Sequence, residues 1–202
     1  MDHKGARSTG KSRETPRPDA RITKSRAALH AALIDLVTEM PFEEVTVASI
    51  TARANVGYAT FFRHYPTREA LLAEIADGLI GEMLVLIAPL VLAQDTGAAA
   101  LALTRFVDDR RPLCRALLVG AGDAMRRDIT ARAITAAEAA GTDTPEWLPR
   151  DLGIVHGVAG TLTILRWWLE HDTERDASGM AHVIVRLVFA PIAGGAAPGH
   201  RQ

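Results

Sequence analysis

Residues 46–65 read TVASITARANVGYATFFRHY, and this stretch decides how the chain folds. Thr46 is a good N-cap for a short helix, and apolar residues follow it at helical spacing. Asn55 and Gly57, on either side of Val56, interrupt this pattern and tolerate unusual backbone angles. We therefore expect two short helices joined by a tight turn, which is a helix-turn-helix. The apolar seam between these helices is predicted to consist of Ile50, Ala54, Val56 and Phe61.

The sequence on both sides of this motif is helical as well. From Thr23 to Met40 apolar residues recur every three or four positions, and Pro41 ends the run. After Pro66, Thr67 can cap a long helix whose apolar stripe extends as far as Ala88, before Pro89. The motif is therefore the second half of a three-helix domain, and a long fourth helix follows it.

Further helices are expected throughout the rest of the chain. They span residues 98–109, 112–119, 123–140, 150–170 and 180–189, with Gly141 closing the third of them and a loop at 142–149. The spacing of Gly153, Gly157 and Gly160 is typical of close helix packing. The predicted fold class is all-α, with an N-terminal three-helix helix-turn-helix domain and a C-terminal helical domain. The predicted organisation is a flexible basic arm at 1–20, a helix-turn-helix domain at 21–66, a second domain at 67–192 and a flexible tail at 193–202.

Charge and composition favour a protein in which only the first part meets nucleic acid. The formal net charge is -1, yet residues 1–66 hold ten Lys or Arg and seven Asp or Glu, whereas residues 67–202 hold 13 and 17. No apolar run follows the early basic residues, and the apolar stretches 83–93 and 154–169 are too short or too polar for a bilayer. The single cysteine, Cys114, cannot form an internal disulfide. We expect a cytoplasmic protein with no membrane association.

The third helix leaves one face for a DNA duplex. Tyr58 and Ala59 suit apolar contact with thymine methyl groups, and Thr60 can hydrogen-bond to a base or phosphate. His64 and Arg68 can donate to phosphates. A short helix cannot bury Tyr58, Phe61 and Phe62 together, so Tyr58 or Phe62 should be exposed. The motif therefore predicts double-stranded DNA as a partner.

The residues from Ile22 to about Leu79 resemble the DNA-binding domain of the TetR family of bacterial regulators. The resemblance rests on Thr46, Ala54-Asn55-Val56, Thr60-Phe61-Phe62-Arg63-His64-Tyr65 and the following Pro66-Thr67-Arg68-Glu69-Ala70-Leu71-Leu72. This chain has Asn55-Val56-Gly57 where the family usually has Gly-Val-Ser, and Phe62 where it usually has Tyr. The resemblance implies DNA contacts by Thr46, Val47, Gly57, Tyr58, Ala59, Thr60, Phe62, His64 and Arg68.

The same resemblance implies a ligand-responsive regulator, with repression the expected output and a palindromic operator bound by a homodimer. The helices at 150–170 and 179–190 are apolar around most of their circumference, which predicts burial against a second copy. An unknown small-molecule effector would bind the second domain. The candidate pocket residues are Phe106, Met125, Trp147, His156 and Trp167, for which packing in the core or an interface is the alternative.

Enzyme functions find little support in the sequence. It contains no Gly-rich phosphate loop, nucleophile elbow or metal-spaced His or Cys cluster. We therefore expect no catalytic residue, no cofactor and no metal. One alternative is a helical small-molecule-binding protein whose DNA binding is vestigial, and a second is a helical enzyme acting on a hydrophobic small molecule. The sequence leaves open whether Cys114 has a redox role.

Overall fold

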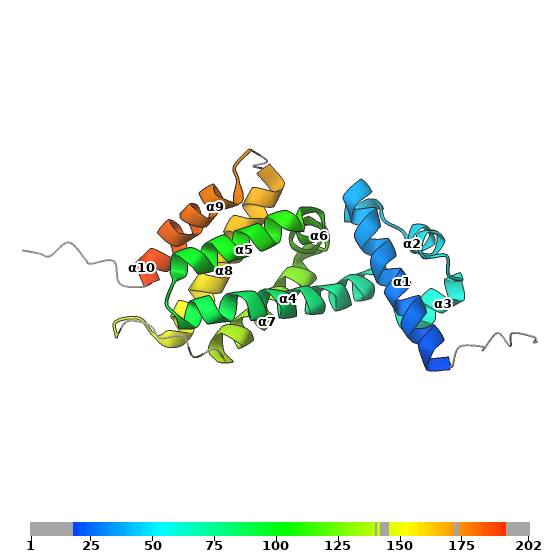
Figure 1. Cartoon of the computed structure of the whole chain (residues 1–202), viewed down its shortest axis with the longest axis horizontal. Coiled ribbons are helices and arrows are strands. Elements are labelled where there is room, and N and C mark those ends of the chain that lie inside the picture. The colour runs from blue at the N-terminus through cyan, green and yellow to red at the C-terminus, as the bar shows by residue number, and fades with distance from the viewer. Residues whose placement is uncertain (1–17, 140, 142–145, 172–173, 193–202) are drawn as a thin grey trace, which may run out of the picture.

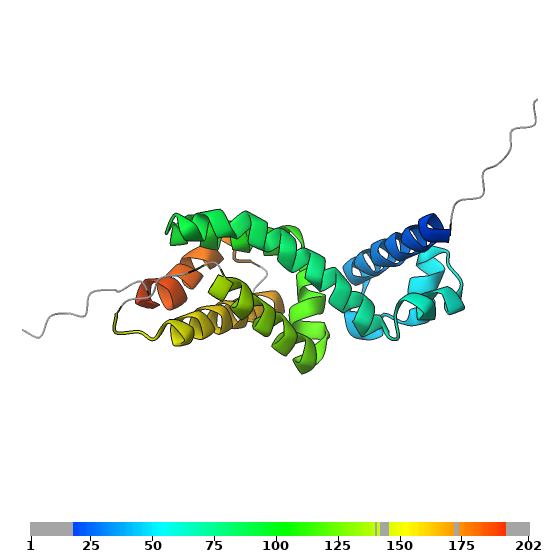
Figure 2. The same cartoon turned by 90° about the horizontal axis from the view of Figure 1, so that it is seen from below.

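The computed structural model describes residues 18–139, 141, 146–171 and 174–192, and all regular secondary structure within them is helical. Figure 1 shows two groups of helices joined by the long helix α4, with α1–α3 at one end of the molecule and α10 at the other. Figure 2, which views the molecule from below, shows the same two groups. The all-α fold class predicted from the sequence is confirmed.

The first group consists of three helices and one short turn of 3-10 helix. Its elements are α1 (Pro18–Glu39), η1 (Phe42–Glu44), α2 (Val47–Ala54) and α3 (Tyr58–His64). Ile50 of α2 and Phe61 of α3 are completely buried, as the predicted seam requires, and Ala54 and Val56 pack against the same core. Leu29 and Leu33 of α1 close this core from the other side.

The fourth helix runs further than its sequence indicates. α4 spans Arg68–Leu92 and contains Pro89, which was expected to end it. A proline removes one hydrogen bond, here the bond to the carbonyl of Val85, and its ring crowds that carbonyl. Val85 lies on the outside of the molecule, with 79% of its surface exposed, so water can solvate the carbonyl. The helix continues because the backbone N–H of Ala93 donates to the carbonyl of Pro89 at 3.0 Å.

The second group contains the remaining helices. They are α5 (Thr96–Asp109), α6 (Arg111–Arg115), the π-helical turn η2 (Ala116–Gly120), α7 (Gly122–Ala139), α8 (Arg150–His171), α9 (Ala177–Ile184), the π-helical turn η3 (Val185–Phe189) and α10 (Ala190–Ile192). α5 packs between α4 and α9, and α7 packs on α8. Gly141 follows α7 with φ +71°, the left-handed conformation expected of a residue that closes a helix.

Helix α8 contributes buried apolar side chains to the second group. Trp168 is completely buried, and its indole N–H donates to the carbonyl of Arg175 at 3.0 Å. A Cβ at Gly160 would lie 3.2 Å from Cγ2 of Val188, so this glycine permits the close packing that the sequence predicts. By length and composition α8 is apolar enough to cross a bilayer, with 33% of its apolar window buried. The core helix of a globular protein has the same properties.

The predicted flexible ends differ in part from the structure. Residues 18–20 belong to α1, so this helix begins before the expected position, whereas the rest of the predicted arm lies outside the described residues. The predicted tail at 193–202 lies entirely outside them, as do residues 142–145 of the predicted loop.

Candidate nucleic-acid interface

The start of α2 is fixed by a reciprocal pair of hydrogen bonds. The hydroxyl oxygen of Thr46 accepts from the backbone N–H of Ser49 at 3.0 Å, and the hydroxyl oxygen of Ser49 accepts from the backbone N–H of Thr46 at 3.0 Å. This capping box satisfies two backbone donors that a helix start would otherwise leave without a partner. The predicted N-cap is confirmed, and Thr46 and the partly exposed Val47 lie at the end of α2 where a phosphate backbone can approach.

The turn between α2 and α3 uses the residues that depart from the usual family pattern. Asn55 has φ 52° and ψ 46°, a left-handed conformation that asparagine adopts more readily than most residues. Gly57 is the N-cap of α3 and makes no side-chain capping bond, because it has no side chain. The turn is thus formed without the Ser hydroxyl that usually caps this helix.

The outer face of α3 is exposed and partly aromatic. Tyr58 and Phe62 are 56% and 48% exposed, and their rings meet edge to face with centroids 5.1 Å apart. Ala59 is exposed beside them, and Thr60 is half-buried. Since Phe61 points into the core, the same helix is anchored on one side and open on the other. This combination gives a rigid face on which apolar side chains and a hydroxyl can meet base edges.

Arg63 belongs to this face and was missed by the sequence reasoning. It is exposed, and its guanidinium donates to the hydroxyl oxygen of Thr60 at 3.1 Å. Among the residues that the structure describes, no carboxylate pairs with it. The helical spacing between positions 60 and 63 was a usable signal, because residues three apart lie on neighbouring parts of a helix surface.

The end of α3 is tied to α1 and α4 by polar contacts. The hydroxyl of Tyr65 donates to Oε1 of Glu74 at 3.0 Å and lies 3.0 Å from Nε2 of His30. His30 also lies 2.7 Å from Glu74, and the hydrogen bond from the Arg26 guanidinium holds the pKa of Glu74 below its usual value. These contacts fix α3 relative to its two neighbours.

His64 takes part in the same anchoring. Its Nε2 lies 2.8 Å from the hydroxyl of Ser25, which itself donates to the carbonyl of Ile22 at 2.9 Å. The Ser25 oxygen therefore accepts from Nε2–H of His64. Only Nδ1 is left for another partner.

Arg68, which the sequence predicts to contact a phosphate, also makes several contacts within the protein. Its guanidinium donates to the carbonyls of Phe42 and Glu43 at 3.0 and 3.1 Å, and also to that of Val45. It lies 4.8 Å from the centre of the Phe42 ring and pairs with Glu69. Nη1 makes all three carbonyl contacts and Nε faces Glu69, so Arg68 holds η1 against the start of α4, while its contact with a phosphate stays a prediction.

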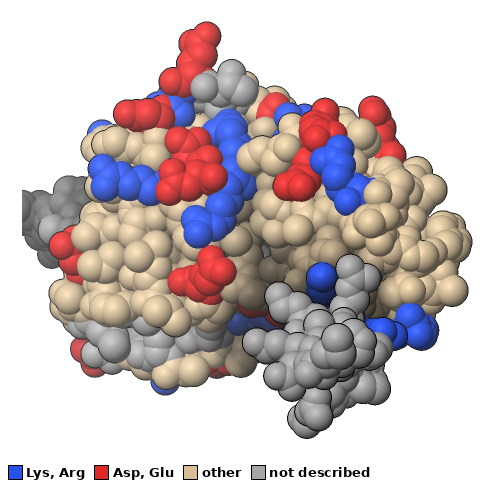
Figure 3. Space-filling model, turned by 45° about the vertical axis from the view of Figure 1, so that its right-hand side comes forward, with Lys and Arg blue, Asp and Glu red and all other residues tan. Residues whose placement is uncertain are grey.

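The charge on the described part of the helix-turn-helix domain is balanced. Residues 18–66 contain five Lys or Arg and five Asp or Glu, so the positive excess of the amino-terminal part lies in residues 1–17. Arg26 pairs with Glu74, and Arg53 pairs with Glu39. Basic and acidic side chains are correspondingly mixed on the face shown in Figure 3.

Four of the five predicted pocket residues have described side chains, and these differ widely in exposure. Phe106 is buried, whereas Trp147 and Trp167 are 68% and 48% exposed and His156 is also exposed. The side chain of Met125 lies outside the described part of the chain. For Trp167, which stacks on His171, a surface or interface position is what the structure shows. The helical spacing of these aromatic residues did not predict which of them would be buried and which exposed.

Comparison with known proteins identifies the amino-terminal domain. Residues 29–75 match the family model described as bacterial regulatory proteins, tetR family. The HTH-type transcriptional regulator YxbF of Bacillus subtilis is 36% identical over 70 residues, which cover 30% of this chain and only 18% of that relative.

Solved structures share the fold over most of the chain. A TetR-family transcriptional regulator from Syntrophomonas wolfei has a TM-score of 0.70 at 13% identity, covering 88% of this chain and 99% of its own. FadR of Thermus thermophilus, a TetR-family transcriptional repressor solved with lauroyl-CoA, has a TM-score of 0.60 at 18% identity, covering 86% and 98%. These relatives are regulators, not enzymes, in agreement with the prediction from the sequence. Residues 29–75 thus match the amino-terminal domain of the TetR family of bacterial regulatory proteins, and the chain as a whole shares the fold of solved structures that carry this family's name.

Proposed function

We propose that this protein is a cytoplasmic transcriptional repressor that binds a palindromic operator as a homodimer and leaves it when a small molecule binds the second group of helices. The observation that carries the proposal is the outer face of α3. Tyr58, Ala59, Phe62 and Arg63 are exposed there, on a helix that Phe61 anchors in the core. A short helix held in this way fits the major groove, with its first residues at base edges.

An apolar strip on the second group of helices supports the homodimer. Leu152, Val155 and Trp167 are 56%, 44% and 48% exposed, and their spacing places them on one face of α8. Leu187 of η3 is 63% exposed. Large apolar side chains repeated along one exposed helix face are typical of a surface that a second copy covers. A dimer through α8 and the segment from α9 to α10 would pair two α3 helices with one operator.

A buried hydroxyl in the second group of helices supports an effector. Thr161 lies on α8 and is 8% exposed, and its Oγ1 has no hydrogen-bond partner among the residues that the structure describes. An unsatisfied buried hydroxyl costs free energy unless a ligand or water supplies the partner. The T. thermophilus repressor of the same fold was solved with lauroyl-CoA, which supports an effector with an apolar portion for this chain as well.

The helix α4 would couple effector binding to release of the operator. It begins beside the helix-turn-helix domain, where Arg68 holds η1, and extends along the second group of helices. An effector that binds better when α4 is displaced would move the two α3 helices away from the separation of about 34 Å that successive major grooves require. Operator DNA must then weaken effector binding by the same factor.

Selection of random duplex DNA tests the proposal. The wild type should enrich an inverted repeat, whereas Tyr58→Ala should bind the selected site at least about tenfold more weakly, because one good base contact contributes about 1–3 kcal/mol. Trp147→Ala is the matched control, since it also removes an exposed aromatic ring but lies far from α3 in the chain. Absence of any enriched sequence would support the vestigial DNA-binding alternative and overturn the proposal.

A further inference from the structure

The side chain of Arg63 leaves α3 on the side opposite the protein core. Successive residues of a helix are rotated by about 100° around its axis, so Ala59 and Arg63 both point away from the direction of Phe61. Phe61 is completely buried, whereas Ala59 and Arg63 are exposed. These two residues therefore form the line along α3 that reaches deepest into a groove that the helix enters.

The guanidinium of Arg63 lies beside the first turn of α3, although the residue itself belongs to the last turn. Long side chains on a helix point towards its N-terminus. In this direction Nη2 of Arg63 donates to the hydroxyl oxygen of Thr60, the third residue of the helix, at 3.1 Å. Ala59, one turn before Arg63, has too short a side chain to block this path. The guanidinium is thus at the end of α3 whose residues reach base edges in a helix-turn-helix.

The guanidinium of Arg63 is oriented by a neutral group and not neutralised by an acidic one. Arg26 and Arg53 of the same domain pair with carboxylates, but no carboxylate pairs with Arg63 within the described part of the chain. Its bond to Thr60 occupies one N–H group and leaves the others for a ligand. A fixed guanidinium loses less conformational entropy when it binds, so it is prepared for an acceptor outside the protein.

The donors of this side chain fit guanine better than the other bases. In the major groove guanine presents two acceptors side by side, N7 and O6. Adenine presents an acceptor beside a donor, cytosine presents a donor, and thymine presents an acceptor beside a methyl group. A planar guanidinium can donate to N7 and O6 together, which no single donor can do.

We propose that Arg63 reads a guanine in the operator, donating to its N7 and O6 from a guanidinium that Thr60 holds beside the first turn of α3. The inference rests on the proposed function, because it requires a DNA site with a preferred sequence. The aromatic pair of Tyr58 and Phe62 lies on the other flank of α3 and contacts other bases. Each half-site therefore contains a G·C pair at the position that the centre of α3 faces.

The test measures the affinity of the full-length protein for the selected operator and for its single-base variants, by fluorescence anisotropy. The wild type should prefer G·C at one position of each half-site by about fivefold or more. Arg63→Ala should lose this preference and keep the others, and Arg63→Lys should lose most of it because an ammonium group cannot make the paired contact. Arg21→Ala is the matched control, since it removes another exposed arginine of the same domain, near the start of α1, and should leave every base preference unchanged.

Modified bases test the two acceptors directly. Replacement of this guanine by 7-deazaguanine removes N7 and should weaken binding by the wild type about threefold or more, without weakening binding by Arg63→Ala further. Replacement by hypoxanthine, which lacks only the amino group in the minor groove, should leave the affinity of the wild type unchanged. Thr60→Val should reduce the preference for G·C at the same position, because the guanidinium loses its partner.

The outcomes separate this inference from the proposed function. If the wild type selects an operator but Arg63→Ala, with folding verified by circular dichroism, lowers affinity evenly at every position, Arg63 contacts phosphate only. That result would overturn the inference and leave the sequence-specific regulator standing. If the wild type enriches no sequence, the inference and the proposed function are both wrong.

Discussion

The helix-turn-helix domain and the second group of helices are stabilised in different ways. α2 and α3 have only eight and seven residues, too short to be stable alone, so they depend on the capping box at Thr46, the left-handed Asn55 and the buried ring of Phe61. α8 has 22 residues and depends on packing against other helices. The geometry of the helix-turn-helix domain is therefore determined by residues that are close in the sequence, whereas that of the second group depends on packing between helices that are far apart in the sequence.

Truncation of one aromatic residue of α3 should separate stability from DNA binding most clearly. Phe61→Ala should destabilise the helix-turn-helix domain by about 3–5 kcal/mol, because a completely buried phenylalanine leaves a cavity. Phe62→Ala, which removes the neighbouring half-exposed ring, should cost less than about 1 kcal/mol and should weaken DNA binding without unfolding. Urea denaturation followed by circular dichroism measures both. Equal destabilisation by the two variants would show that α3 is not anchored on one side only.

Substitutions of Arg68 test the contact between η1 and the start of α4. Arg68→Ala should lower the free energy of unfolding by about 2 kcal/mol, because three carbonyl oxygens lose a charged donor. Arg68→Lys should recover only part of this loss, since an ammonium group cannot match the planar guanidinium on the Phe42 ring. The same urea titrations measure these effects. An unchanged stability combined with weaker, less salt-dependent DNA binding would instead support the phosphate contact predicted from the sequence.

Substitutions of Asn55 test whether this residue fixes the conformation of the turn between α2 and α3. Asn55→Ala should cost about 1 kcal/mol, because alanine tolerates the φ of 52° poorly, whereas Asn55→Gly should be nearly neutral. Thermal denaturation of the two variants side by side measures the difference. Similar melting temperatures for both would mean that the turn can relax out of the left-handed conformation.

Ionisation of the Cys114 thiol should leave the free energy of unfolding unchanged near neutral pH and lower it in alkali. Burial raises the pKa of its thiol to about 12, although Arg110 acts in the opposite direction. The unfolded thiol ionises at lower pH than the folded one, so stability present below pH 9 is lost as the pH rises towards 12. The free energy of unfolding of the wild type should therefore fall relative to that of Cys114→Ala above pH 9.

Reactivity of the native thiol gives an independent check on Cys114. Its side chain is 4% exposed, so a thiol reagent at pH 8 should label it only after unfolding. Rapid labelling of the native protein would contradict the buried, protonated thiol and would reopen a redox role for this residue.

The sequence predicted most of the fold and the local structure of the helix-turn-helix, for identifiable reasons. The caps, the turn and the seam depend on residues a few positions apart, so their spacing alone located them. The contacts of Arg68 were missed because the carbonyls that it binds lie 23–26 residues earlier in the chain. Helix α4 continues past Pro89 because the next backbone hydrogen bond, from Ala93 to the carbonyl of Pro89, still forms, which a pattern of apolar residues does not reveal.

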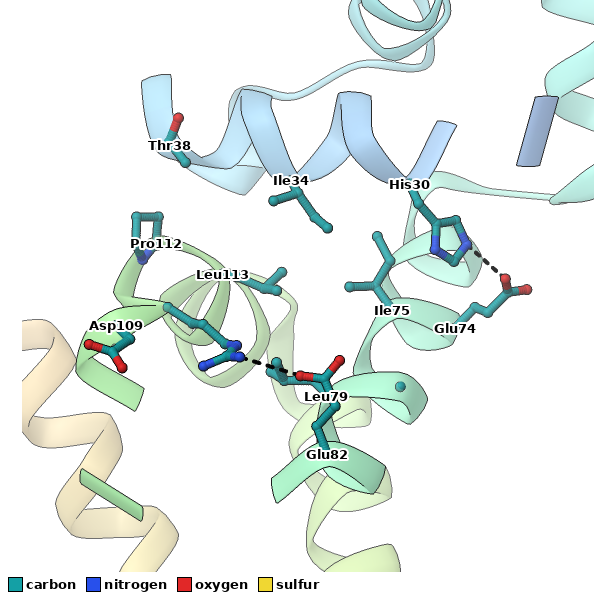
Figure 4. A pocket seen from close by; sticks show the side chains of 12 residues that line it. His30, Ile34, Thr38, Glu74, Ile75, Leu79, Glu82, Asp109, Pro112 and Leu113 are labelled. Atoms are coloured by element: carbon teal, nitrogen blue, oxygen red, sulfur yellow. Dashed lines mark hydrogen bonds and ion pairs between the residues drawn. The ribbon is translucent and has the colours of Figure 1, made fainter. Parts of the chain in front are cut away.

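Sequence reasoning could not predict the cavity that lies between the helix-turn-helix domain and the second group of helices (Figure 4). Its walls are residues of α1, α4 and α6 that only the packing of these helices brings together. Gly78, which lines the cavity, gave no signal in the sequence, because a glycine in the middle of a helix has many explanations. A cavity formed between elements requires the three-dimensional arrangement.

The most direct test of the central claim is the affinity of the protein for every single-base variant of its selected operator, measured for wild type and Tyr58→Ala. The account predicts that the variant loses its base preference at one or two positions of each half-site and keeps it elsewhere, because α3 touches bases through a few side chains. Preferences that are identical in the two proteins at every position would contradict the claim that the outer face of α3 reads the sequence.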